Sequence, residues 1–420
     1  MTMQRDCPRI LLLMTPTTYR ATDFLRAGAA AGVEIVVGTN RAQTLAGLAP
    51  DHNLTLPFDD PAAAEALVLA YADRCPVRAV VGVDDEAVLP AARLAAALGV
   101  PHNTVESVAM TRSKILMREC IAGAGLSGPP FLASCRMPDP GRVGDEIGFP
   151  CVVKPAALSG SRGVIRVDRA DDLEAVWQRV SRILETAHRE ERQGLEDDRL
   201  LLERFMPGEE VSLDALLQEG RLRPLALFDK PDPMDGPAFA ETIFIVPSRQ
   251  PRLVQNAILD AAGAAAAALG LNHGPIHAEF RIHEGEVHLL EVAARTIGGL
   301  CSRALRFAAG TSLEEIVLRH ACGLTLPVLA RENQASGVFM LPVPRPGTLT
   351  GIKGLNEARR VDGIEEVVLT IPLGDEVVPL PEESRILGFL FARGATPAAV
   401  EASLRAAEIF LKVEIQPPTP

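Results

Sequence analysis

Aromatic residues are scarce in this chain, at 4% of its 420 residues, so its hydrophobic cores must be built from Ala, Leu and Val. The seven cysteines are scattered without a CxxC pair, which argues against a disulfide framework and favours reduced thiols. No apolar run approaches the roughly 20 residues of a membrane span. The N-terminal MTMQRDCPRI lacks the basic and apolar regions of a signal peptide. We therefore expect a cytoplasmic location and no membrane partner.

Basic residues are outnumbered by acidic ones, 42 to 54, which gives a formal net charge of −12 and a pI near 5.3. Because an acidic protein repels the phosphate backbone, we do not expect a nucleic-acid partner. The length predicts two or three domains. The sequence does not fix the oligomeric state, and a homodimer, the commonest soluble assembly, stays open.

The first hundred residues alternate between strand and helix signals. We predict strands at 10–14, 33–37 and 79–83, and helices at 24–31 and 86–98. This order indicates a parallel, doubly wound sheet. The segment TPTTYRAT after the first strand lacks GxGxxG, so it does not predict a dinucleotide site.

The most informative stretch is GPIHAEFRIHEGEVHLLEVAARTIGG, at 274–299. It predicts two strands, 276–282 and 287–293, joined by a turn at Glu284-Gly285, with Glu279 and Glu291 opposite each other. Opposed carboxylates repel, and a bound Mg²⁺ would convert that repulsion into a site. The alternative is two solvated strand glutamates. Arg295 and the Gly298-Gly299 pair favour the site, because they add an anion-binding fork and an unhindered backbone.

A second candidate site lies in FPCVVKPAALSGSRGVIRV, where a strand at 151–153 leads into a small-residue loop at 159–163. The glycines Gly160 and Gly163 allow backbone N–H groups to approach a phosphate, and Lys154 could reach the same group. The GK[ST] ending of a Walker A loop is missing, and a plain hairpin is the alternative.

A third candidate site lies in LLLERFMPGEEVSLDALL, which predicts strands at 200–202 and 211–217. Leu202, Phe205 and Met206 could form an apolar slot for adenine, and Glu210 could accept from a ribose diol. An exposed acidic turn is the alternative.

Histidines crowd the predicted hairpin, but they do not follow the spacing of a zinc site. We expect no histidine metal centre. His277 shares the face of Glu279, either as a pocket-lining residue or as a plain core histidine.

The motifs follow one another in a fixed order: a helical lysine, VVKP with its small-residue loop, ERFMPGEE, and two acidic strands ending in EVAAR. In this order and spacing, residues 111–331 resemble the ATP-grasp carboxylate–amine ligases. The segments GVFMLPVPRPGTLTGIKG and PLPEESRILGFLFARG look like the closing domain of the L-amino-acid ligases. The resemblance implies an N-terminal doubly wound α/β domain (1–110), a central ATP-grasp domain (111–335) and a C-terminal α+β closing domain (336–420).

The resemblance also implies roles for individual residues. Lys114 and Lys154 would hold ATP phosphates under a lid loop, Glu279 and Glu291 would bind Mg²⁺ (or Mn²⁺), and Arg295 would steady the acyl phosphate or the substrate carboxylate. The other implied residues are Ser159, Gly160, Ser161 and Gly163 in the lid, Glu203, Arg204, Phe205 and Met206 at the adenine, Glu210 at the ribose, Glu241 near a substrate amino group, Lys230 at a phosphate, and His277, Gly298 and Gly299 at the substrate. Ala293 stands where many members carry an Asn that contributes to the metal site.

The activity implied is ATP-dependent amide formation between a small-molecule carboxylate, expected to be an amino acid, and an amine through an acyl phosphate. The alternatives are a carboxylase or purine-pathway-type ligase that shares the ATP-grasp machinery, and a nucleotide-binding protein without turnover. Amino-acid-dependent ATP hydrolysis would separate the enzyme from the non-catalytic binder.

Overall fold

The computed structural model describes residues 7–43, 49–187 and 197–418. Its N-terminal part is a parallel sheet of order β3-β2-β1-β4, as the alternating strand and helix signals predicted. Alternate residues of β1 enter two different hydrophobic clusters, so helices cover both faces of the sheet. The elements are β1 (Arg9–Leu13), α1 (Ala21–Ala31), β2 (Glu34–Thr39), β3 (Asn53–Thr55), α2 (Pro61–Ala72), β4 (Ala79–Gly82) and α3 (Asp85–Leu98).

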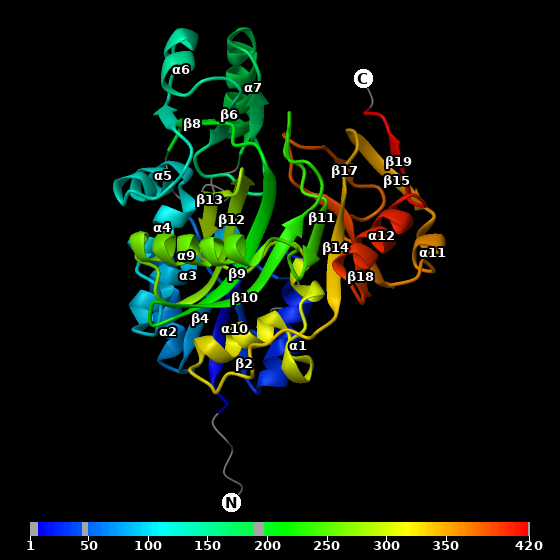
Figure 1. Cartoon of the computed structure of the whole chain (residues 1–420). Helices are drawn as coiled ribbons and strands as arrows, with labels where there is room; N and C mark the ends of the chain where they lie inside the picture. The colour runs from blue at the N-terminus through cyan, green and yellow to red at the C-terminus, as the bar shows by residue number, and fades with distance from the viewer. Residues whose placement is uncertain (1–6, 44–48, 188–196, 419–420) are drawn as a thin grey trace, which may run out of the picture.

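A second, antiparallel sheet of order β5-β8-β6-β7 forms a separate lobe at the top of Figure 1. Its core includes Trp177, the single tryptophan of the chain. The lobe contains β5 (Phe131–Ser134), α6 (Pro140–Glu146), β6 (Cys151–Pro155), β7 (Ile165–Val167), α7 (Leu173–Thr186) and β8 (Leu200–Arg204). Two helices, α4 (Val105–Arg112) and α5 (Lys114–Gly123), connect it to the N-terminal part.

The largest sheet has eight strands in the order β13-β12-β9-β10-β11-β14-β18-β16. Its strands are β9 (Glu209–Gln218), β10 (Arg221–Lys230), β11 (Ile243–Val246), β12 (Gly274–His283), β13 (Glu286–Ala293), β14 (Ala335–Pro342), β16 (Ile364–Leu369) and β18 (Ile386–Gly394). The alanine-rich α9 (Arg252–Ala268) packs on one face, where its small side chains allow a close approach. Strands of the predicted central and C-terminal domains therefore form one continuous sheet.

The C-terminal part adds a small sheet, β17-β15-β19, and packs α12 (Pro397–Glu408) against β14 and β18 (Figure 1). Its other elements are β15 (Gly347–Lys353), α11 (Leu355–Ala358), β17 (Glu376–Val377) and β19 (Lys412–Gln416). Helix α10 (Leu313–Ala321) instead packs on the N-terminal sheet, through Val317 and Leu318. Short 3₁₀ turns occur at η2 (Pro50–His52), η3 (Ala170–Asp172), η4 (Cys301–Ala304) and η5 (Ala308–Gly310).

The predicted hairpin is confirmed as β12 and β13, with Glu279 directly paired to Glu291. Its turn residues Glu284 and Gly285 both have positive φ, 52° and 82°, as a two-residue hairpin turn of the right twist requires. A β-bulge follows Glu279, and it re-aims the side chains that come after it. None of the helices in the described ranges has both the length and the apolar character that crossing a bilayer would require.

Candidate active site

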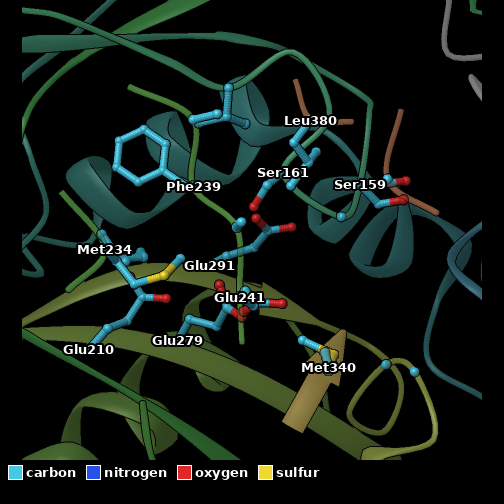
Figure 2. Close-up of a pocket in the computed structure, with 18 of the residues that line it drawn as sticks. Ser159, Ser161, Glu210, Met234, Phe239, Glu241, Glu279, Glu291, Met340 and Leu380 are labelled. Atoms are coloured by element: carbon cyan, nitrogen blue, oxygen red, sulfur yellow. The ribbon is translucent and has the colours of Figure 1, made fainter. Parts of the chain in front are cut away.

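A cavity of about 620 Å³ lies where the lobe, the large sheet and the N-terminal part meet. The C-terminal part borders it through Met340, through 342–344 and through both ends of the segment 379–386, which we name the closing segment. Figure 2 shows Ser159 and Ser161 on one side, Met340 on the other, and the glutamates between them. Most of the predicted site residues line the cavity: Lys114, Lys154, Ser159, Gly160, Ser161, Glu203, Arg204, Phe205, Met206, Glu210, Glu241, His277, Glu279, Glu291, Arg295, Gly298 and Gly299.

Gly163 is the exception among the predicted lid residues, because it is not part of the cavity wall. Its φ is +71°, and an added Cβ would lie 2.7 Å from the ring of Pro155, so a glycine is needed there for packing. Its N–H donates to the carbonyl of Pro381 at 2.8 Å. Arg162 also donates to the carbonyl of Glu382 at 2.8 Å, so the closing segment holds the loop from outside.

The floor of the cavity carries a cluster of carboxylates. Glu210, Glu241 and Glu279 each offer an oxygen within 4.8 Å of the others. The Lys230 ammonium lies behind them, 2.7 Å from Glu210 and 3.0 Å from Glu279, and it also pairs with Glu241. Lys230 was expected at a phosphate, but in the structure it is 4% exposed and engaged by these three carboxylates.

Electrostatics in this cluster are finely balanced. Burial alone would lower the pKa of Lys230, but the three carboxylates outweigh it and hold the pKa well above its ordinary value. Burial raises the pKa of Glu241, and the charge of Glu279 adds to the rise. Burial acts in the same direction on Glu279, but Lys230 and His277 outweigh it and lower that pKa. His277 has its pKa raised to about 9 against burial, because Asp214 and Glu279 both contact its ring.

The donor set of this floor fits a divalent cation. Four carboxylates face only three cations, namely Glu210, Glu241, Glu279 and Asp214 against Lys230, His277 and Arg281. One negative charge is therefore left over within the described cluster, and hard carboxylate oxygens are the ligands that Mg²⁺ prefers. Ala293, where the resemblance expected an Asn, pairs with His277 at the end of β13 and lines the cavity, so it leaves room for water.

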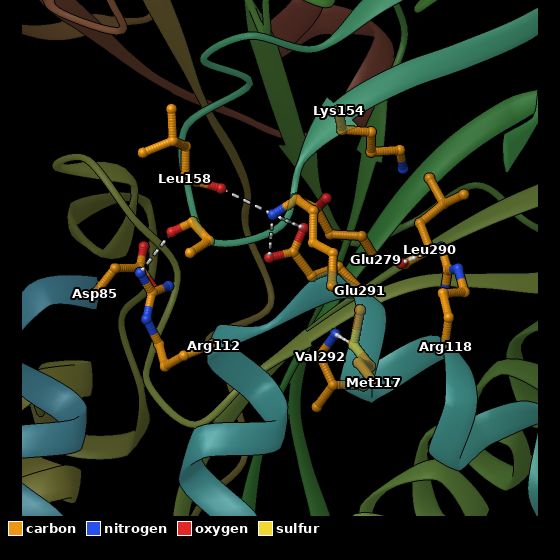
Figure 3. A network of polar contacts seen from close by, with 12 residues as sticks. Asp85, Arg112, Met117, Arg118, Lys154, Leu158, Glu279, Leu290, Glu291 and Val292 are labelled. Atoms are coloured by element: carbon orange, nitrogen blue, oxygen red, sulfur yellow. Dashed lines mark hydrogen bonds and ion pairs between the residues drawn. The ribbon is translucent and has the colours of Figure 1, made fainter. Parts of the chain in front are cut away.

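Glu291, the partner of Glu279 across the hairpin, is held by Lys114 at 3.1 Å. Lys114 also donates to the carbonyl of Leu158 at 2.9 Å, at the entrance of the small-residue loop. Lys114 is the first residue of α5, and the hydroxyl of Ser113, just before it, caps the helix by accepting from the N–H of Leu116. Figure 3 shows this network, in which the loop, the helix and the hairpin converge on Glu291.

Lys154, at the end of β6, pairs with Glu203 of the neighbouring strand β8 at 2.5 Å. Glu203 is 2% exposed and also contacts Arg118 at 2.5 Å. Burial alone raises the pKa of Glu203, but the two cations outweigh it and lower the pKa to about 2. The resemblance placed Glu203 at the adenine, whereas in the structure its carboxylate holds the two cations. Any contact with an adenine edge would therefore come from the chain after it.

An apolar cluster beside Glu203 shares Phe205 with the predicted adenine slot, whereas Leu202 of that slot packs in the core of the lobe. Val152, Phe205, Met234 and Phe239 pack together, with the rings of Phe205 and Phe239 6.3 Å apart. Figure 2 shows Met234 and Phe239 on this side of the cavity. Apolar and aromatic side chains at the wall of a cavity suit a purine, and the adenine site stays a prediction.

Glu210, expected at a ribose, is 6% exposed and binds Arg281 at 2.9 Å as well as Lys230. Arg204, expected at the adenine, lines the cavity and donates to the carbonyl of Ile147 at 2.6 Å. Both side chains therefore line the cavity and also bond to other residues of the protein.

Arg295 is fixed by a residue that our sequence analysis missed. Asp85, the first residue of α3, accepts from Arg295 at 2.6 Å and from Arg112 at 3.0 Å. Burial would raise the pKa of Asp85, but the two guanidiniums hold it well below its ordinary value. Asp85 follows the carboxyl end of β4, where ligands bind in open α/β sheets, and that position could have identified it from the sequence.

Gly298 and Gly299 both border the cavity, but they differ in the space around them. A Cβ at Gly298 would meet nothing within 4 Å. One at Gly299 would lie 3.0 Å from the ring of Phe389, on a backbone with φ +62°. Of the two glycines, Gly298 therefore has the open space beside it.

Comparison with known proteins agrees with this geometry. Family models match an ATP-grasp N-terminal domain at 25–102, an ATP-grasp domain at 147–304 and an L-amino acid ligase C-terminal domain 2 at 339–416. An L-arginine-specific L-amino acid ligase of Bacillus subtilis is 25% identical over 74% of each chain. A D-alanine–D-alanine ligase of Desulforudis audaxviator is 30% identical over 52% of this chain and 71% of its own.

The crystal structure of an L-amino acid ligase from Bacillus licheniformis superposes with a TM-score of 0.83, at 23% identity, over 97% of this chain and 99% of that one. This likeness shows that the two folds agree along nearly the whole chain. The three family models and the D-alanine–D-alanine ligase relative establish that the chain is an ATP-dependent ligase of the ATP-grasp family, with the C-terminal domain of the L-amino acid ligases.

Proposed function

We propose that this ligase joins the carboxylate of one amino acid to the amino group of a second. The observation that carries the proposal is the arrangement of Glu241, Glu279 and Arg295 around one cavity. An amino acid presents an ammonium and a carboxylate only two bonds apart. Glu241 offers an anion for the ammonium, and Arg295, which Asp85 holds at 2.6 Å on the wall of the same cavity, offers a cation for the carboxylate. Relatives named for joining amino acids support the same substrate class.

The reaction activates a poor acyl donor. An oxygen of the carboxylate attacks the γ-phosphorus of ATP, the bond to the β,γ-bridging oxygen breaks, and ADP leaves. The amine nitrogen then attacks the carbonyl carbon of the acyl phosphate, loses a proton and expels phosphate, which leaves an amide. The protein contributes mainly positioning and charge neutralisation.

The chain's own residues divide these tasks. Lys114 and Lys154 neutralise phosphate charge from the two sides of the small-residue loop, to which Ser159 and Ser161 belong. Phe205 and Met206 face the base. Arg295, fixed by Asp85, is pre-oriented to donate to the developing oxyanion, a contribution typically worth about 3 kcal/mol. Glu279 and Glu291 would hold Mg²⁺, which supplies charge neutralisation and orientation of the phosphate oxygens when bound.

The test is phosphate release from ATP with Mg²⁺ across all pairs of amino acids, with mass spectrometry of the products. We expect release that requires a particular pair and yields a condensed product. Chelation of the metal and the variant Glu291→Gln serve as negative controls. ATP binding without release under any pair would contradict the proposal and favour a non-catalytic nucleotide-binding protein. Release that requires bicarbonate or a nucleotide precursor would favour the carboxylase or purine-pathway alternatives.

A further inference from the structure

The cavity wall next to Glu241 is apolar and is built from segments far apart in the sequence. Phe244 comes from β11, Cys301 from η4 and Met340 from β14, and all three side chains are at most 5% exposed. The sulfur atoms of Cys301 and Met340 are 3.7 Å apart. Figure 2 shows Glu241 between Ser161 and Met340.

Tyr19, from the loop after β1, completes this wall. Its ring meets that of Phe389 edge-on at 5.6 Å, and it is 39% exposed because it faces the open cavity. Gly299 lies beside both Phe389 and Cys301, since an added Cβ would lie 3.0 Å from the ring and 3.4 Å from the sulfur. We name the space bounded by Tyr19, Phe244, Cys301 and Met340 the sulfur-aromatic slot.

The charged side chains that line the cavity have protein partners elsewhere. On the floor, Glu241 and Glu279 share Lys230, and at the rim Arg385 turns to Asp375 at 2.7 Å. The four residues that bound the slot are uncharged. A charged substrate side chain placed there would lose its hydration without gaining a partner, whereas an apolar one would gain by leaving water.

We propose that the sulfur-aromatic slot binds the side chain of an apolar amino acid, of the class of Met, Leu or Phe, whose ammonium group rests on Glu241. This inference depends on the proposed function, and it concerns the acyl donor, because the ammonium of the donor takes no part in bond formation. Tyr19 then acts as a specificity residue contributed by the N-terminal part. Flexible sulfur and aromatic surfaces adapt to apolar side chains of several shapes.

The experiment uses the full-length enzyme with saturating ATP, Mg²⁺ and one fixed acceptor, and it varies the donor. Fragmentation of the product by mass spectrometry identifies which residue supplied the carboxyl group. We expect kcat/KM for Met, Leu and Phe donors to exceed that for Lys, Arg, Asp and Glu at least about 100-fold. Tyr19→Ala should lower kcat/KM for Leu about 10-fold and change that for Ala less than about 2-fold, with KM for ATP unchanged.

Two matched variants test whether these effects come from the slot. Tyr19→Phe keeps the ring and should restore the preference for Leu. Leu253→Ala, at a side chain on α9 that is 81% exposed, should have no effect. A charged amino acid as the best donor, or equal losses for Leu and Ala in Tyr19→Ala, would overturn the inference while leaving the ligase intact. Absence of an amide product with every amino acid would instead overturn the proposed function, and the inference with it.

Discussion

Glu203 gives the sharpest quantitative prediction, because its carboxylate is buried and bridges two cations. Glu203→Gln preserves the shape of the side chain but removes the charge that faces Arg118 and Lys154. We expect the variant to be destabilised by about 3 kcal/mol at pH 7. Breaking a buried ion pair by removing one partner typically costs 3–5 kcal/mol, since the other charge stays buried.

The magnitude also follows from the carboxyl's titration. The pKa of Glu203 falls from an ordinary 4.5 to about 2 in the folded protein. Each pKa unit corresponds to 1.36 kcal/mol, so a difference of about 2.5 gives about 3 kcal/mol. Because the folded pKa lies below the unfolded one, this stabilisation is fully present above pH 4.5 and is lost as the pH falls toward 2. The difference between wild type and variant should shrink over the same window.

The single tryptophan makes the measurement local. Trp177 lies in the same hydrophobic core as Leu200 and Leu202 of β8, the strand that carries Glu203. Urea unfolding followed by its fluorescence at pH 7, 5 and 4 would give the free-energy difference for this lobe. Glu146→Gln, in an exposed pair with Arg142, is the matched control and should change little. A loss below about 1 kcal/mol at pH 7 would refute the reasoning.

Three further predictions concern activity and backbone conformation. Glu291→Gln should reduce Mg²⁺-dependent phosphate release at least about 100-fold with an unchanged circular dichroism spectrum, and substantial remaining turnover would defeat the metal assignment. Arg162→Ala, which loses its bond to the closing segment, should raise the ratio of phosphate released to amide formed, whereas Arg142→Ala should not. Gly299→Ala should lower stability by about 1–3 kcal/mol in thermal unfolding because its φ is positive, whereas Gly298→Ala should be tolerated; equal effects would contradict this.

Where local patterns were strong, the sequence predicted the fold well. The pairing of Glu279 with Glu291 was predicted by counting outward from Gly285 and is confirmed. The pairs nearer the turn are one residue off that count, and the β-bulge after Glu279, which has no local signal, brings the two glutamates opposite each other. The parallel N-terminal sheet followed from the alternation of strands and helices, although β3 and α2 were missed. β3 is only three residues long, and an alanine-rich helix such as α2 has almost no amphipathic pattern to detect. Assembly of β14, β16 and β18 into the large sheet depends on long-range pairing that has no local signal.

Many residues of the candidate site were predicted from the sequence, but the side chains that pair with them were not. Two carboxylates on a hairpin and a lysine before a small-residue loop are visible in sequence, because they are local patterns. Asp85 lies 210 residues from Arg295, and Lys230 lies 49 from Glu279, so their contacts appear only once the chain is folded. The family resemblance placed Glu203 at the adenine, and nothing local in the sequence indicates that Arg118 and Lys154 share its carboxylate.

The way the three regions meet at the cavity follows from the proposed chemistry. An acyl phosphate is also lost to hydrolysis where water reaches it, so the site must close before the phosphoryl group is transferred. The closing segment bonds to the loop through Pro381 and Glu382, while the N-terminal part fixes Arg295 through Asp85. The loop over the phosphates and the arginine beside the carboxylate are thus each positioned by a different part of the chain. A closed, correctly charged site therefore requires all three regions together, which is the arrangement expected of an enzyme that must protect a reactive intermediate.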